Sequence, residues 1–211
     1  MNTSTPTPTS PDQPDAPQPG LRERKKQQTH QALQAAAQRL VAERGFDHVS
    51  IGEIAAAANV SKRTFSNHFP SKEAAIVDPP PQMMARFAAE LAARPYDEPL
   101  LDGVHAVQVA SFTADFDDVA TRVRLIRASP ALQQRYAIAA AAFGNLVRGW
   151  VAARTGEPDT ALHPVLIAAL CDTVTRVAIT RWDPDTPISH LTDLITEIYT
   201  LLAHVATPKP T

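Results

Sequence analysis

The chain has 211 residues, enough for one full-sized domain or for a small unit joined to a larger one. Its composition of 44% hydrophobic and 20% charged residues, with only seven glycines, excludes a fibrous or largely unfolded chain and favours a helical globular protein. The single cysteine, Cys171, excludes an internal disulfide and a zinc site built from several cysteines.

Charge is distributed unevenly along the chain. Residues 21–72 carry nine Lys and Arg against four Asp and Glu, whereas residues 73–211 carry eleven against sixteen. A basic segment in an otherwise acidic chain indicates contact with a polyanion, although chance clustering remains an alternative. The N-terminus lacks the basic start and apolar run of a signal peptide, and no stretch of about 18 uninterrupted apolar residues follows. We therefore expect a cytoplasmic protein without a membrane span.

The first predicted elements are a disordered tail and a long helix. Residues 1–20 contain six of the 19 prolines and almost no apolar side chain, so this tail cannot bury enough surface to offset its ordering entropy. Residues 21–45 predict an amphipathic helix, because Leu33, Ala37 and Leu40 share one face. Gly45 is suited to end it, since glycine accepts a left-handed conformation.

Two short helices joined by a tight turn follow. Ser50 and Glu53 have the spacing of a capping box, and Asn59 stands where the turn needs positive φ. Ser61 caps the second helix, which Pro70 ends. This arrangement predicts a helix-turn-helix over residues 21–77. Its core is expected to contain the apolar side chains Val49, Ile54, Val60, Phe65 and Phe69.

The remainder predicts an all-α body over residues 82–206. A short helix at 71–78 stops at three consecutive prolines, 79–81, which mark the boundary between head and body. Proline and glycine punctuation then predicts helices at about 82–93, 98–114, 117–128, 130–155, 160–182 and 187–205.

The head resembles the TetR family of bacterial repressors. The resemblance rests on the stretches AERGF at 42–46, VSIGEIA at 49–55, VSKRTF at 60–65 and HFPSKE at 68–73. It implies a DNA-binding head of three helices, a ligand-binding helical body and a homodimer on a palindromic operator. The DNA-binding residues that it implies are Ser50, Ser61, Lys62, Arg63, Thr64, Ser66, Asn67, His68 and Lys72.

Physical reasons support several of these residues, and alternatives exist for others. Lys62 and Arg63 stand at a helix N-terminus, whose free N–H groups suit phosphate, and arginine can also bridge the O6 and N7 atoms of guanine. Lys72 is expected to clamp a phosphate, whereas His68 is either a DNA contact or a packed histidine. The family usually has aromatic or other large residues where this chain has Ser66 and Asn67. The basic start of the long helix, which either reaches DNA or is merely solvated, comprises Arg22, Arg24 and Lys25.

The body resembles actinobacterial members of the family, including mycofactocin-type regulators. The stretches that carry this are RLI at 124–126, SPAL at 129–132 and AARTG at 152–156. The resemblance implies a long apolar effector such as an acyl-CoA. The candidate pocket residues are Phe112, Tyr136, Phe143 and Arg176, for which plain core packing is the alternative, and Cys171 is expected to be a small buried hydrophobe.

Two other classes of protein stay open. The chain could be an architectural protein that binds DNA without sequence preference. A helical enzyme is the remote alternative, because no catalytic cluster, metal-ligand spacing or phosphate loop is found, and neither a metal nor a cofactor is predicted. The leading interpretation is a repressor that a small apolar effector releases from DNA, with the last two helices pairing across the dimer axis.

Overall fold

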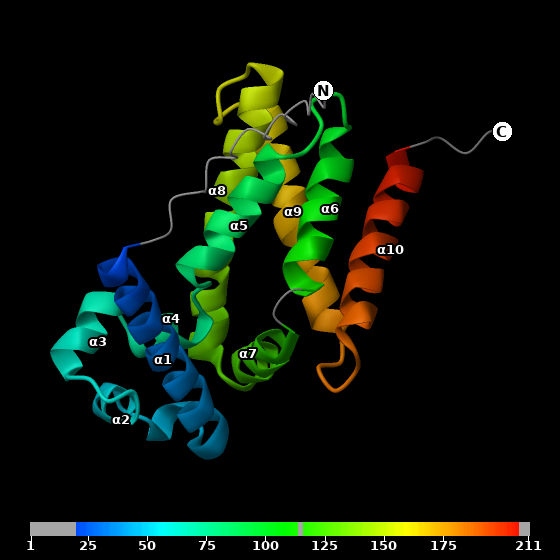
Figure 1. The fold of residues 1–211 in the computed structure, drawn as a ribbon. Coiled ribbons are helices and arrows are strands. Elements are labelled where there is room, and N and C mark those ends of the chain that lie inside the picture. Colours follow the sequence, from blue (N-terminus) through cyan, green and yellow to red (C-terminus); the bar gives the residue numbers. More distant parts are fainter. Residues whose placement is uncertain (1–19, 114–115, 207–211) are drawn as a thin grey trace, which may run out of the picture.

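The computed structural model describes residues 20–113 and 116–206, and among these every regular element is helical (Figure 1). The predicted disordered tail therefore lies outside the described residues, apart from Gly20. The elements in chain order are α1 (Leu21–Arg44), a 3₁₀ turn (Phe46–His48), α2 (Ile51–Ala57), α3 (Lys62–His68), α4 (Lys72–Val77), α5 (Pro81–Ala92), α6 (Leu100–Thr113), α7 (Phe116–Ala128), α8 (Pro130–Thr155), α9 (Leu162–Arg181) and α10 (Ile188–Ala206). The predicted all-α fold class is confirmed.

Local sequence signals fix the ends of the first helices. Gly45 follows α1 with φ 83°, and Asn59 makes the turn after α2 with φ 61°. Ser50 and Glu53 form the predicted capping box, and Ser61 caps α3 by accepting a hydrogen bond from the backbone N–H of Thr64. These contacts satisfy N–H groups that have no partner within their own helix.

Helices α1 to α4 enclose one part of the core. Leu33, Ile54, Phe65 and Phe69 are buried together in it, as predicted, while Val60 is only partly buried at its edge. Helix α4 has four successive buried residues, 74–77, because it packs against α1 on one side and against α7 and α8 on the other. The core of the head thus continues through α4 into the body.

Helices α5 to α10 form the body around a second core. The long helices α8 and α9 pack along each other, and α6 packs against both α9 and α10 (Figure 1). Trp182 is fully buried in this core, and its ring nitrogen donates a hydrogen bond to the carbonyl of Pro187. The observed helices begin and end within two residues of the predicted bounds.

Helix α9 is the one described helix that is long and apolar enough to cross a membrane, with a mean hydropathy of 1.5. The expectation of no such stretch considered uninterrupted apolar residues only, and α9 is interrupted by Asp172 and Arg176. Since α9 packs against α6, α8 and α10, we interpret it as a core helix.

Candidate functional site

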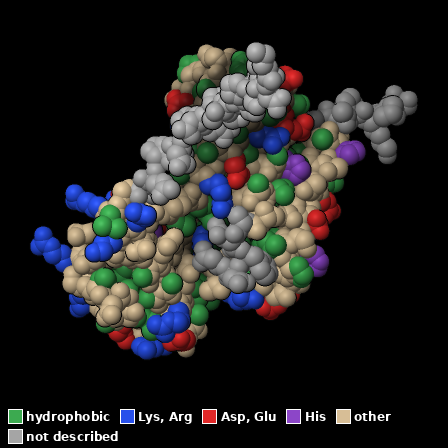
Figure 2. Space-filling view, viewed as in Figure 1, with side chains coloured by type: hydrophobic (Ala, Val, Ile, Leu, Met, Phe, Trp, Pro, Cys, Tyr) green, Lys and Arg blue, Asp and Glu red, His purple; other side chains and the backbone are tan. Residues whose placement is uncertain are grey.

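The polar face of α3 is open to solvent. Ser61, Lys62, Arg63, Ser66 and Asn67 are exposed, while the apolar side of the same helix is buried through Phe65. Figure 2 shows the Lys and Arg side chains gathered over the head, at the left of the view. The start of α1 adds exposed basic side chains, which are those of Arg22, Arg24, Lys25 and Lys26.

Gly52 has a role that the sequence did not indicate. A Cβ atom at this position would lie 2.6 Å from Cε of Lys62, so the side chain of Lys62 lies directly over the first turn of α2. Because glycine has no side chain, the flexible end of Lys62 can rest against α2 at this position.

The hydroxyl group of Ser50 is already engaged within the head. It donates to Oε2 of Glu53 at 2.7 Å and accepts from the backbone N–H of Glu53 at 3.3 Å. Hydrogen bonds from the backbone and the hydroxyl of Ser50 lower the pKa of Glu53, and Arg44 adds to this effect. Ser50 therefore caps α2 first, and any contact with DNA comes in addition.

Lys72 is placed differently from the expectation that it clamps a phosphate. Its ammonium group donates to the carbonyl oxygens of Phe46 at 2.6 Å and Val49 at 2.8 Å, and lies 3.9 Å from the centre of the Phe46 ring. These contacts tie the 3₁₀ turn to α4. The two carbonyl groups and the aromatic face hold the partly buried ammonium against the head, so a phosphate contact by Lys72 stays a prediction that would use its third N–H.

His68 follows the packed alternative more closely than the DNA-contact one. It is partly buried, with its ring centre 5.9 Å from that of His30 on α1, and His30 in turn lies 4.2 Å from the ring of Phe69. Burial lowers the pKa of His68, with Lys26 adding to the effect, and burial followed by the charge of His68 lowers that of His30. Their surroundings therefore favour the neutral form of both rings.

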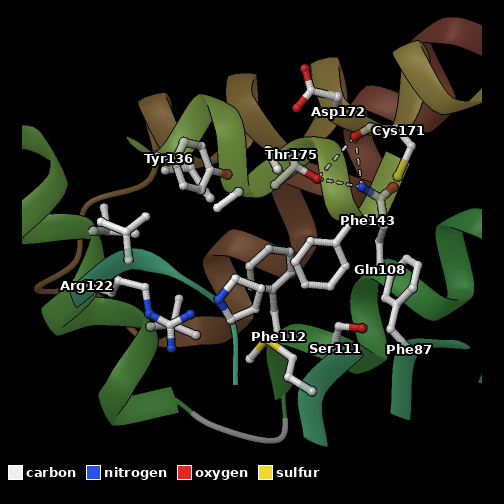
Figure 3. Close-up of a pocket in the computed structure, with 18 of the residues that line it drawn as sticks. Phe87, Gln108, Ser111, Phe112, Arg122, Tyr136, Phe143, Cys171, Asp172 and Thr175 are labelled. Atoms are coloured by element: carbon white, nitrogen blue, oxygen red, sulfur yellow. Dashed lines mark hydrogen bonds between the residues drawn. The ribbon is translucent and has the colours of Figure 1, made fainter. Parts of the chain in front are cut away.

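A cavity of about 120 Å³ lies within the body, next to the head. Phe112, Tyr136 and Phe143 line it, as do Phe87 and Cys171, which the sequence did not indicate as pocket residues (Figure 3). Cys171 is buried, as expected, and burial raises the pKa of its thiol to about 12.

Arg176 does not line this cavity. Its side chain is exposed on α9, whose cavity-facing residues are instead Cys171, Asp172, Thr175 and Ile179. Arg176 follows Asp172 by one helical turn, which places it at the edge of the stripe that faces the cavity, where its side chain extends into solvent. The prediction for Arg176 is corrected for that reason.

A buried hydrogen-bond network forms one wall of the cavity. The amide nitrogen of Gln108 donates to the carbonyl of Cys171 at 3.0 Å and to the hydroxyl of Thr175 at 2.6 Å (Figure 3). Behind this wall, the hydroxyl of Tyr199 donates to the amide oxygen of Gln108. The network joins α6, α9 and α10. No periodicity of the sequence predicts it, since Gln108 and Tyr199 are 91 positions apart.

The end of α4 belongs both to the head and to the cavity wall. Val77 and Pro79 line the cavity, while Asp78 between them forms a bidentate ion pair with Arg135 of α8, in which Nε lies 2.6 Å from Oδ1. On the other side, the side-chain amide of Gln34 in α1 donates to the carbonyl of Asp78 at 2.8 Å. Helix α1 is thus bonded to a segment that the cavity contacts.

Two family models match different parts of the chain. The family described as "Bacterial regulatory proteins, tetR family" matches residues 33–76, and the "MftR C-terminal domain" matches residues 98–207. The "HTH-type transcriptional regulator TcmR" of Streptomyces glaucescens is 30% identical over 174 residues, which cover 78% of this chain and 77% of that protein.

Two solved structures share the fold. One is FadR of Thermus thermophilus, a TetR family transcriptional repressor in complex with lauroyl-CoA, with a TM-score of 0.53, 22% identity and coverage of 86% of this chain and 97% of that chain. The other is the fatty acid degradation regulator FadR from Bacillus halodurans, with a TM-score of 0.52, 17% identity and the same coverage. With its helix-turn-helix head and matching helical body, the chain belongs to the TetR family of bacterial transcription regulators.

Proposed function

We propose that this protein is a homodimeric repressor that leaves a palindromic DNA operator when a small molecule enters the cavity of its body. The observation that carries the proposal is the position of α4, because Val77 and Pro79 line the cavity while Gln34 of α1 binds the carbonyl of Asp78. A ligand that widens the cavity must move this segment, and the bonded head moves with it. The ligand acts through its different affinities for the two arrangements.

The DNA-binding surface of this proposal is the exposed face of α3. Lys62 and Arg63 begin the helix, and Ser66 and Asn67 follow on its exposed side. In a dimer, two such helices enter major grooves roughly 34–36 Å apart, which corresponds to one turn of the duplex. Such a regulator works where the chromosome lies, which in bacteria is the cytoplasm.

The partner in the proposed dimer is a second copy, bound through α9 and α10. Leu162, Val165 and Leu166 are exposed near the start of α9, and Leu201 is exposed near the end of α10. The two helices are antiparallel neighbours, so the start of α9 and the end of α10 lie at the same end of the body (Figure 1). Large exposed apolar groups gathered in one region are typical of protein interfaces.

The proposed effector is small and mostly apolar. An acyl-CoA is one candidate, because FadR of Thermus thermophilus binds lauroyl-CoA. The cavity here measures about 120 Å³, well below the roughly 300 Å³ or more of pockets that hold drug-sized ligands. A long acyl chain would therefore enter only after the helices around the cavity separate.

A gel shift on the chromosomal region upstream of the protein's own gene tests the DNA-binding function. We expect a complex that survives an excess of unrelated competitor DNA. The double variant Lys62→Ala, Arg63→Ala should abolish this complex at physiological salt. If some binding persists at low salt, its affinity should depend less steeply on salt concentration, as expected for the loss of up to about two phosphate contacts. The matched control removes two exposed charges far from α3, in the double variant Arg176→Ala, Arg181→Ala.

Three outcomes are decisive. A specific complex lost only in the α3 variant supports the repressor. Equal competition by unrelated DNA would instead indicate an architectural DNA-binding protein. Unchanged binding of the α3 variant would refute the proposed surface.

A further inference from the structure

The volume of the cavity limits a ligand to about one ring. An engineered cavity of about 150 Å³ in another protein, lined by apolar side chains, binds benzene, and the cavity here is close to that size at about 120 Å³. It lies between the two cores, because Tyr136 packs against the core that continues from the head while Phe112 and Phe143 pack against that of the body. A ligand in it therefore contacts both cores.

The wall of the cavity favours an aromatic ring. Phe87, Phe112 and Phe143 come from three different helices, α5, α6 and α8, and face the same space (Figure 3). Phe87 and Phe143 already meet edge to face, with ring centres 5.0 Å apart and planes at 77°. An added ring can make the same kind of contact, which is worth more than its buried area alone.

The hydroxyl groups that α6 and α9 contribute to the wall have their protons engaged. That of Ser111 donates to the carbonyl of Val107 at 2.7 Å, and that of Thr175 donates to the carbonyl of Cys171 at 3.1 Å. The amide nitrogen of Gln108 also donates to the Thr175 hydroxyl and so fixes it further. In this arrangement the two hydroxyl groups can only accept a hydrogen bond from a ligand.

The hydroxyl group of Tyr136, in contrast, has a proton to donate. It lines the cavity and makes no hydrogen bond with any described residue. Burial and then the charge of Asp172 raise its pKa to about 12, so it keeps its proton at neutral pH. In Figure 3 it points from α8 toward α9. A ligand group that meets it must accept a hydrogen bond.

The surroundings of Tyr136 disfavour an anionic ligand. Burial and the carboxylate of Asp172, which lines the cavity, also raise the pKa of the Cys171 thiol to about 12. The charge of Arg122 lowers the pKa of Tyr136, but burial and Asp172 outweigh it. Two groups of the wall thus keep their protons because this space disfavours negative charge, and a carboxylate ligand meets the same cost. A neutral hydroxyl group avoids that cost.

We propose that the effector is a phenol, with its neutral ring among the phenylalanines and its hydroxyl group accepting a hydrogen bond from Tyr136. This inference names the ligand of the function proposed above and rests on it. A hydroxyl group both accepts and donates, so it can also turn its own proton toward the acceptors of α9. A ring without a polar group would leave the buried hydroxyl of Tyr136 unpaired, which costs free energy.

Ligand-observed NMR titrations of the full-length protein test this inference without DNA. Phenol is compared with anisole, which accepts a hydrogen bond but cannot donate one, with the anion benzoate and with the cation of benzylamine. We expect phenol to bind at least about tenfold more tightly than either charged probe and about threefold more tightly than anisole. Tighter binding of any of these three probes would overturn the inference, and so would no binding of phenol.

The substitution Tyr136→Phe tests the assigned hydrogen bond. It should weaken phenol binding by roughly three- to tenfold while leaving that of toluene, which has no hydroxyl group, unchanged. Tyr96→Phe is the matched control, because Tyr96 is 77% exposed and lies outside the cavity, and it should change neither ligand. Equal weakening of both ligands by Tyr136→Phe, or an effect as large in the control, would contradict the contact.

The substitution Asp172→Asn tests why the ligand is neutral. Removing this charge should lower the ratio of the phenol affinity to the benzoate affinity by roughly threefold or more. Asp193→Asn removes an exposed acid of α10 outside the cavity and should leave the ratio unaltered. A ratio that Asp172→Asn does not lower would contradict the assigned charge preference.

The repressor proposal is judged separately by release of DNA in the gel shift. If lauroyl-CoA releases the DNA and phenol does not bind, the repressor stands and the phenol fails. If the protein binds phenol but no specific DNA, the repressor fails and the ligand class stands.

Discussion

Single glycines show how closely the side chains of this protein approach one another. Gly52 leaves space for Lys62, and Gly103 of α6 lies against the ring of Trp150 from α8. An added Cβ at position 103 would lie 2.9 Å from that ring and 3.0 Å from Oε2 of Glu98. At these two positions glycine matters because it has no side chain to collide with the neighbouring group, and not because of its backbone freedom.

We predict that Gly103→Ala destabilises the protein. The partly buried indole ring is rigid and cannot withdraw as a flexible chain end could, so we expect a loss of about 1–3 kcal/mol in the free energy of unfolding, measured by urea titration. Gly149→Ala on α8 is the matched control, because nothing lies within 4 Å of its added Cβ. The control should be neutral or stabilise by about 0.5–1 kcal/mol, since alanine favours a helix. Equal effects of the two substitutions would contradict this argument.

The two histidines at the contact of α1 with α3 give the head a predictable response to pH. The pKa of His30 and that of His68 lie below the usual 6.5 in the folded protein, mainly because of burial. Well above pH 6.5 both rings are neutral in the folded and unfolded states, so stability there does not depend on their titration. As the pH falls below 6.5 the unfolded chain binds protons that the folded head does not, and the free energy of unfolding decreases down to the folded pKa values.

Replacing one of these histidines should flatten that response. The charged groups that influence His30 are His68, Lys26 and Asp78, of which only Asp78 favours its protonated form. We expect His30→Gln to lose less stability than the wild type between pH 7.5 and pH 5.5, measured by urea unfolding. The control His190→Gln removes an exposed histidine at the start of α10 and should retain the wild-type slope. A slope that His30→Gln leaves unaltered would show that acid acts elsewhere.

Among the elements, α4 has the most consequential position. It is only six residues long, yet it contacts α1 in the head and α7 and α8 in the body. The ion pair of Asp78 with Arg135 fixes its end, and each of these side chains is 25% exposed, so solvent screens the pair only in part.

We predict that Arg135→Met loosens α4. The variant should lower the free energy of unfolding by roughly 1 kcal/mol, and the backbone N–H groups of α4 should exchange with solvent faster in hydrogen-exchange measurements. Arg39→Met is the control, because Arg39 pairs with Glu43 on the surface of α1 with both side chains about half exposed. Its effect should be smaller, at about 0.3–0.5 kcal/mol, without faster exchange in α4. Comparable exchange in both variants would argue against α4 as the link.

At the scale of the whole molecule, the proposed dimer explains the apolar groups on α9 and α10. We predict that Leu166→Glu, which introduces a charge into that region, weakens the dimer by about a hundredfold or more. Sedimentation velocity at several protein concentrations measures this change. Ile138→Glu is the control, since Ile138 of α8 is comparably exposed, at 59% against 51% for Leu166. A dimer lost in the Ile138 variant alone would place the interface on α8.

The sequence by itself determined the fold class, the helix bounds and the helix-turn-helix. Those features depend on neighbours within a few positions, such as the Ser50 and Glu53 capping box, the turn at Asn59 and the prolines between helices. The resemblance of residues 42–73 to one family added the expected function, which the family comparisons then confirmed at the level of a TetR regulator.

Only the tertiary structure decided which polar side chains are exposed to solvent and which make contacts inside the protein. The ammonium group of Lys72 donates hydrogen bonds to the carbonyls of Phe46 and Val49. Arg176 is exposed to solvent, and the arginine that lines the cavity is Arg122. Each outcome depends on elements far apart in the chain, as does the Asp78–Arg135 pair across 57 positions. Periodicity indicates which face of a helix is apolar. Which residues that face contacts depends on how several helices pack, because apolar surface is buried only in the assembled core.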